Sequence, residues 1–244
     1  MGQPRKTSRY TSIRSSQERV RDRYPEIGTR LDELQELSDD QYDQVREILG
    51  VSQLFNLDLL LLSLAARSAD VIDAFTYALD RWNISTASAL VRLQVDNVLR
   101  AHVAAIYPDP DQLFLHLAAD KRFDKLEVPE ALLKLLPDAP KKARFTDRVL
   151  VELAQAHHSW IADVYKTSSA WVHHSAAHVL TTWQISDSGE VAGRFPVDIN
   201  LFEPDFLAPI ADAMIVSTKT LVAYLDSWKL SKLGLRNREE QGES

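Results

Sequence analysis

Three histidines lie close together in a segment that is compatible with a helix, and imidazole is the side chain best suited to proton transfer near neutral pH. They are His173, His174 and His178. His174 and His178 are four residues apart and would share one face of a helix. Trp171 and Ser175 continue the stripe that contains His178, so this helix would carry polar groups toward a core.

A second polar row follows a helical repeat, because Arg92, Asp96 and Arg100 stand at positions i, i+4 and i+8. The carboxylate of Asp96 could then bridge both guanidinium groups. If the row is solvated, it is a surface salt-bridge ladder that adds little stability. If Asp96 lies at the border of the core, beside apolar neighbours such as Val95 and Leu99, the arginines would have donors free for a phosphate or carboxylate ligand.

The histidines have three interpretations. In the first they are structural, as surface or satisfied core imidazoles, and this includes His157 and His158. In the second, His173, His174 and His178 are catalytic and perform acid–base or phosphate-contacting chemistry. Ligand-binding side chains around them would be Tyr165, Ser169 and Ser175.

The third interpretation is a metal site, since two histidines four apart have the pitch of helical metal ligands. No glutamate follows His174 as it does in zinc proteases, and no other acidic residue is placed to complete a ligand shell. The chain also has no cysteine, no phosphate-binding glycine-rich loop and no Gly-x-Ser-x-Gly motif. We therefore expect no metal and no cofactor.

Length and charge restrict the class of protein. The 244 residues are 45% hydrophobic and carry a net charge of −7, which is typical of one soluble domain and argues against a broad nucleic-acid or membrane surface. A phosphate site would have to be local. The absence of cysteine and of an apolar export signal favours a cytoplasmic location without membrane association.

The sequence predicts an all-α helical bundle with one small β-hairpin near residues 182–196. We expect a flexible N-terminal arm at residues 1–23, a single helical domain at 24–235 and a disordered tail at 236–244. Residues 120–146, rich in proline and charge, would form a flap over the core. A helix should end near Leu37, with Ser38 capping another, and the long histidine helix from Thr146 should break near residues 168–169.

In residues 92–100, 141–147 and 164–178 the chain resembles bacterial proteins that are distantly similar to abortive-infection and HEPN-type helical bundles. The similarity covers roughly residues 60–180, and its most distinctive block is residues 164–178. It implies a helical bundle, often dimeric, in a defence or toxin–antitoxin context. The arginine-to-histidine spacing of HEPN ribonucleases is absent, so a site would have to be assembled across helices, with Arg92 or Arg100 opposite His173 or His178, or the nuclease activity is missing.

Two functional hypotheses follow. In the first, a HEPN-like protein binds or acts on a phosphate-bearing ligand such as RNA or a nucleotide, with histidine as acid or base and the arginines holding phosphate. In the second, the chain is a non-enzymatic adaptor or antitoxin-like module whose polar cluster is structural. Both allow a homodimer and a partner protein bound through the N-terminal arm.

Overall fold

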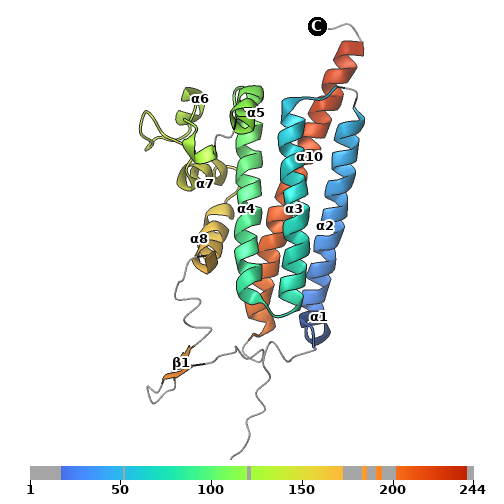
Figure 1. Cartoon of the computed structure of the whole chain (residues 1–244), viewed down its shortest axis with the longest axis vertical. Coiled ribbons are helices and arrows are strands. Elements are labelled where there is room, and N and C mark those ends of the chain that lie inside the picture. The colour runs from blue at the N-terminus through green and yellow to red at the C-terminus, as the bar shows by residue number, and fades with distance from the viewer. Residues whose placement is uncertain are drawn as a thin grey trace, which may run out of the picture.

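Four long helices form the body of the molecule and run along its long axis (Figure 1). The computed structural model of the chain describes residues 18–51, 53–119, 122–172, 183–185, 191–193 and 202–240. The four helices are α2 (Pro25–Gly50), α3 (Asn56–Asp80), α4 (Ile84–Ile106) and α10 (Pro204–Glu240). The expected all-α character is confirmed.

Helix α2 is continuous where the sequence predicted two helices. Ser38 and Gln41 both lie inside it and are almost fully buried, in line with the apolar face of Leu31, Leu34 and Ile48. Packing of this face against α3 and α10 holds the helix together through the predicted boundary. The prediction of a cap at Ser38 was wrong because tertiary burial outweighed local capping preference.

A short helix, α1 (Val20–Arg23), closes the end of the bundle where α3 turns into α4. Val20 is fully buried, and Asp80 accepts hydrogen bonds from the backbone N–H and Nε of Arg21. Trp82, in the turn, has a left-handed backbone with φ of 63° and donates from Nε1 to the carbonyl of Glu18 at 2.9 Å. Residues 18–23 are therefore packed on the bundle, whereas we expected them in the flexible arm.

At this end of the bundle, one glycine lies in close contact with α1. A Cβ on Gly28 would lie 3.1 Å from the Cβ of Arg21, so the missing side chain allows α1 to fold back onto α2.

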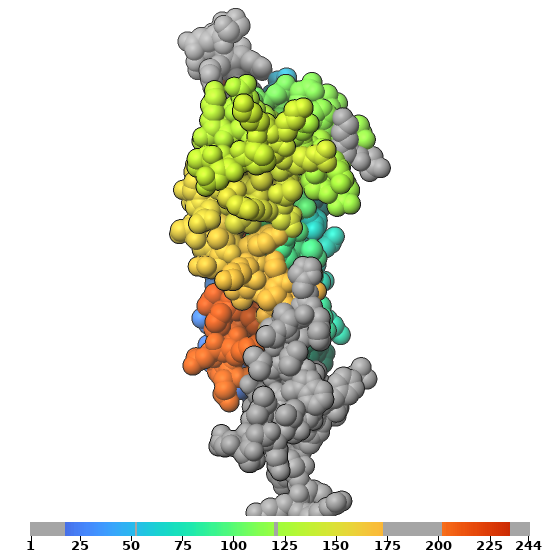
Figure 2. Space-filling view, turned by 90° about the vertical axis from the view of Figure 1, so that its left-hand side faces the viewer, coloured from blue at the N-terminus to red at the C-terminus, as the bar shows by residue number. Residues whose placement is uncertain are grey.

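A second layer covers one side of α4 (Figure 1). It contains α5 (Pro110–Ala118), the 3-10 turn η1 (Phe123–Lys125), α6 (Glu130–Leu133), α7 (Asp147–Gln155) and α8 (Ile161–Val172). Figure 2 shows this layer as one face of the molecule, running from yellow-green to orange above the start of α10.

The predicted flap is anchored in this layer. The N–H of Val128 donates to Ala143 and that of Phe145 donates to Leu126, while Leu132 and Phe145 are buried. These bonds join the two ends of the segment, and its buried side chains belong to the same apolar cluster as the core of the bundle.

The break in the histidine helix lies at residues 156–160, between α7 and α8, and the expected break at 168–169 was wrong. The hydroxyl of Ser168 donates to the carbonyl of Val164, one turn earlier, so this serine is accommodated inside α8.

Two short strands, β1 (Trp183–Ile185) and β2 (Val191–Gly193), pair antiparallel, with residue 184 opposite residue 192. The residues between the strands lie outside the described ranges, so the hairpin at 182–196 stays a prediction.

Among the described residues, one helical stretch, Pro204–Gly234 of α10, is long and apolar enough to cross a membrane. The core helices of helical bundles reach a similar length and apolar composition. In the structure α10 packs along α2 and α4, with Leu221 and Leu225 fully buried. Its helical backbone reaches Glu240, past the expected domain end at residue 235.

Candidate functional site

Arg92 is the centre of a polar cluster between α4, α7 and α8. Its Nε donates to the hydroxyl of Ser169 at 3.1 Å, and its Nη1 donates to Asp96. Its Nη2 contacts Asp147 at 3.0 Å and the hydroxyl of Tyr165 at 2.6 Å. All three guanidinium nitrogens form hydrogen bonds and only 8% of the residue is exposed, so Arg92 links α4 to α7 and α8.

Tyr165 completes this cluster from α8. Its ring lies under the guanidinium of Arg92, with 3.9 Å from Cζ to the ring centroid, and its hydroxyl donates to Asp147 at 2.8 Å. Burial, followed by the hydrogen bond to Asp147, raises the pKa of Tyr165. Burial is the largest single effect and acts to lower the pKa of Arg92, but the charge and hydrogen bond of Asp96, together with those of Tyr165, outweigh it and the pKa of Arg92 is raised. The cluster therefore keeps a charged arginine and a protonated tyrosine.

Arg100 stands one turn further along α4 and is the more accessible arginine of the row. Its Nη1 donates to the carbonyl of Asp96 at 3.0 Å and lies 3.5 Å from the carboxylate of the same residue. The Nε and Nη2 of Arg100 make no hydrogen bond to any residue that the structure describes, and its side chain is 26% exposed. The sequence hypothesis of a partly buried Asp96 holding two arginines agrees with this geometry, and Arg100 is the one with free donors.

Arg100 lines a cleft of about 660 Å³ between α4, α5, η1 and α7, where its Cζ lies 5.7 Å from the ring centroid of Phe123 on the same wall. Arg100, Arg122 and Arg148 contribute three guanidinium groups to its wall, against the two carboxylates of Asp124 and Asp147. The rest of the wall comes from Leu117, Phe123, Phe145, Thr146 and Leu150. Arg122 and Arg148 belong to exposed ion pairs, which solvent weakens and an incoming anion can replace.

A further arginine lies behind the row. Arg67 of α3 donates to the side-chain carbonyl of Asn97, and burial together with the positive charge of Arg100 lowers the pKa of Arg67. Asn97 in turn donates to Gln94, whose amide bonds the hydroxyls of Ser68 and Thr218. This chain of polar side chains ties α3, α4 and α10 together in the core. We did not predict this chain from the sequence, although Gln94 and Asn97 interrupt the apolar face of their helix.

Three of the four described histidines, His102, His157 and His158, gather at another place, around Tyr224 of α10, whereas His116 lies on α5. The hydroxyl of Tyr224 lies 2.7 Å from Nδ1 of His102 and 2.6 Å from Nε2 of His158. The ring of His157 lies 5.2 Å from the ring of His102. We had not selected these three histidines for function. The signal was present, since His102 lies in the apolar last turns of α4, beside Ala101, Val103 and Ala104.

The protonation states around Tyr224 follow from one carbonyl group. Nε2 of His102 faces the carbonyl of Leu153 at 3.2 Å and must donate to it. Burial, followed by the charges of His157 and His158, lowers the pKa of His102 to about 4, so its Nδ1 is an acceptor at neutral pH. The Tyr224 hydroxyl then donates to His102 and accepts from His158. Burial raises the pKa of Tyr224 to about 12, which keeps that proton in place.

The structure thus brings together part of the predicted site. Arg92, Asp96, Tyr165 and Ser169 are in direct contact, and Arg100 adjoins them. The catalytic candidates lie outside the described residues, as does one binding candidate: His173, His174, Ser175 and His178. The helix that leads into this segment, α8, packs directly on α4, as the common-site hypothesis requires.

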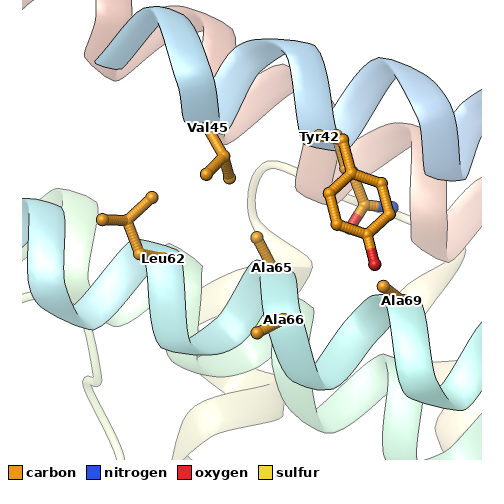
Figure 3. Close-up of a pocket in the computed structure, with 7 residues that line it drawn as sticks. Tyr42, Val45, Leu62, Ala65, Ala66 and Ala69 are labelled. Atoms are coloured by element: carbon orange, nitrogen blue, oxygen red, sulfur yellow. The ribbon is translucent and has the colours of Figure 1, made fainter. Parts of the chain in front are cut away.

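Two smaller cavities lie elsewhere. One of about 200 Å³ lies between α4, α8 and α10. The other, of about 70 Å³, lies between α2 and α3, where Tyr42 and Val45 face Leu62, Ala65 and Ala69 (Figure 3). Its volume is about that of two water molecules, which is too small for a substrate.

Across the described parts of the chain, no group of three or more histidine or acidic side chains is placed to hold a metal ion. Comparison of the chain with family models, with curated proteins and with solved structures gave no match.

Proposed function

We propose that this protein binds a phosphate-bearing ligand, a nucleotide or a segment of RNA, in the cleft beside Arg100. The observation that carries this proposal is the guanidinium group of Arg100, which is held by Asp96, keeps two nitrogens without a hydrogen bond to the described residues and belongs to a residue that lines a cleft. Asp96 holds Arg100, and Arg92 holds Asp96, so Arg100 would lose little side-chain freedom on binding.

The charge of the cleft supports an anionic ligand. Three arginines against two aspartates give its wall one excess positive charge, in a protein whose net charge is −7. Arg100 would form charge-assisted hydrogen bonds to a phosphate, while Arg122 and Arg148 at the rim would supply positive potential. The hydroxyl of Thr146 is a further donor on the same wall.

A HEPN-like, metal-independent ribonuclease activity in a bacterial defence setting is the enzymatic form of this proposal. It requires a histidine near the bound phosphate, as acid or base, and the candidates are His173, His174 and His178. They follow α8, which already supplies Tyr165 and Ser169 to the Arg92 cluster. A homodimer would place two such clefts in one particle.

Binding is tested by fluorescence anisotropy with a labelled 12-nucleotide single-stranded RNA and with ADP as competitor. We expect Arg100→Gln to weaken RNA binding about tenfold, the usual effect of losing one charge-assisted contact. The matched control is Arg46→Gln, which removes an exposed arginine on α2, on another helix of the bundle. Equal affinity of wild type and Arg100→Gln, or no binding at all, would contradict the proposal.

The catalytic form has its own test. RNA cleavage is followed in EDTA with His178→Ala beside His158→Ala. Loss of cleavage in His178→Ala alone is the expected result. Equal activity of the two folded variants removes the reason for choosing His178.

One observation favours the second function, a non-enzymatic adaptor or antitoxin-like module. Arg92 forms hydrogen bonds with four side chains of the protein itself, as expected of a residue with a purely structural role. In that case neither RNA nor ADP binds, while Asp96→Asn still lowers stability.

A further inference from the structure

The 200 Å³ cavity between α4, α8 and the first turns of α10 has a different chemistry from the arginine cleft, and the two share no residue. Apolar side chains form most of its wall, among them Val91, Trp171, Ile210 and Ala213. Asp163 adds a carboxylate on an exposed part of α8. An apolar wall with few polar groups is the usual composition of a small-molecule site.

Ser88 is one of the residues that line this cavity. The residue is 2% exposed, and its hydroxyl has no hydrogen-bond partner among the described residues. Ser168, on the same wall, differs because its hydroxyl donates to the carbonyl of Val164. A buried hydroxyl without a partner is unfavourable, and a ligand group that donates to it or accepts from it removes that penalty.

The size of the cavity limits the occupant. Its volume is about seven times the ~30 Å³ share of one water molecule, which suits a bicyclic ring system and is too small for a helix or a peptide strand. The carboxylate of Asp163 disfavours an anion. The cavity therefore differs in preferred charge from the cleft proposed to bind phosphate.

We propose that this cavity binds a small, neutral, largely aromatic molecule that carries one hydroxyl or amine, with that group hydrogen-bonded to Ser88. The ring system packs between Val91 and Trp171, and Ala213 leaves the space that the ring occupies. This site does not depend on the function proposed for the arginine cleft.

The test uses the full chain and three probes of one shape: 2-naphthol, naphthalene and 2-naphthoate. Ligand-observed NMR and calorimetry measure their affinity and stoichiometry. We expect 2-naphthol to bind one per chain, about fivefold more tightly than naphthalene because of one additional hydrogen bond. The anion 2-naphthoate should bind more weakly than 2-naphthol because of Asp163.

Two variants locate the binding. Ser88→Ala should abolish the preference for 2-naphthol over naphthalene, whereas Ser217→Ala, a buried serine of α10 that lines none of the cavities described above, should not. Ala213→Leu should reduce binding of both neutral probes about tenfold by occupying the space, with the exposed Ala74→Leu as control.

If Ala213→Leu does not fold, Thr167→Trp obstructs the cavity from an exposed position of α8. Absence of one-to-one binding in the wild type overturns the inference. Unchanged binding in the folded Ala213→Leu or Thr167→Trp variant also overturns it, because the probes would then lie elsewhere.

Discussion

Two clusters in this molecule are both held together by ion pairs, but they differ in how much of their side chains is exposed to solvent. Lys232 and Asp58 form an ion pair of 2.7 Å in which neither side chain is exposed. Asp58 also accepts from Trp228 and from the N–H of Phe55, and Lys232 donates to the carbonyl of Ile48. In the Arg92, Asp96 and Arg100 row, by contrast, exposure rises along α4 and ends at a cleft.

This difference distinguishes a cluster with only a structural role from one that also has donors available for a ligand. The Asp58 pair joins the end of α2, the start of α3 and the C-terminal half of α10, and its contacts are all internal. The Arg92 row has an internal end that fastens α4 to α7 and α8, and an outer end with unused donors. A binding role is therefore argued for the outer end alone. The following predictions test this comparison.

The largest effect on stability is expected at the fully buried ion pair of Lys232 and Asp58. Lys232→Met leaves the carboxylate of Asp58 charged and buried, so the free energy of unfolding should fall by about 3–5 kcal/mol. Urea unfolding followed by circular dichroism measures it. Lys219→Met, which removes an exposed partner of Glu33, should cost about 0–1 kcal/mol. Comparable losses in the two variants would show that the pair is not sealed in solution.

The His102 network extends the comparison to a buried group that stays neutral. The pKa of His102 is about 4 in the folded chain against 6.5 for a free imidazole, so the unfolded state binds more protons between these values. Stability should fall as the pH drops below about 6.5, with a loss of about 3 kcal/mol once the pH is near 4.

Urea unfolding at several pH values between 7 and 4 measures this slope for wild type and for His102→Gln. The variant should show a smaller slope, because it lacks the titrating group. An unchanged slope would assign the pH dependence to other residues.

An intermediate effect is expected for Asp96→Asn. The side chain of Asp96 is 14% exposed and holds two arginines, so its loss should cost about 2 kcal/mol, between the values for surface and buried pairs. Asp73→Asn, an exposed aspartate of α3, is the control for thermal unfolding. A change within error for Asp96→Asn would place the whole row at the surface.

The smallest effect on stability is expected at the rim of the cleft. Arg148→Gln should change the free energy of unfolding by less than about 0.5 kcal/mol, since its pair with Glu152 is exposed. The same change should weaken binding of the labelled RNA about threefold through lost positive potential. If RNA affinity is unchanged, the cleft is confined to Arg100 and its neighbours.

Much of the site on α4 could be predicted from spacing alone. The i, i+4, i+8 order of Arg92, Asp96 and Arg100 follows from the pitch of the helix, and so does their mutual contact. Tyr165 and Ser169 were predicted as ligand-binding neighbours of the histidines, and the structure places both against Arg92. The partner Asp147 was not selected, because 55 residues separate it from Arg92 and no periodicity links them.

By itself, then, the sequence determined the helical class and the residues that share a face within one helix, because both depend on local periodicity. Tertiary structure decided the rest. Burial of Leu34 and Ile48 made α2 continuous across a predicted cap. Packing against α10 brought Tyr224 between His102 and His158, which no spacing in the chain encodes. The charge on a side chain and its access to a ligand depend on what neighbouring helices exclude from water, and those neighbours are chosen only when the helices pack.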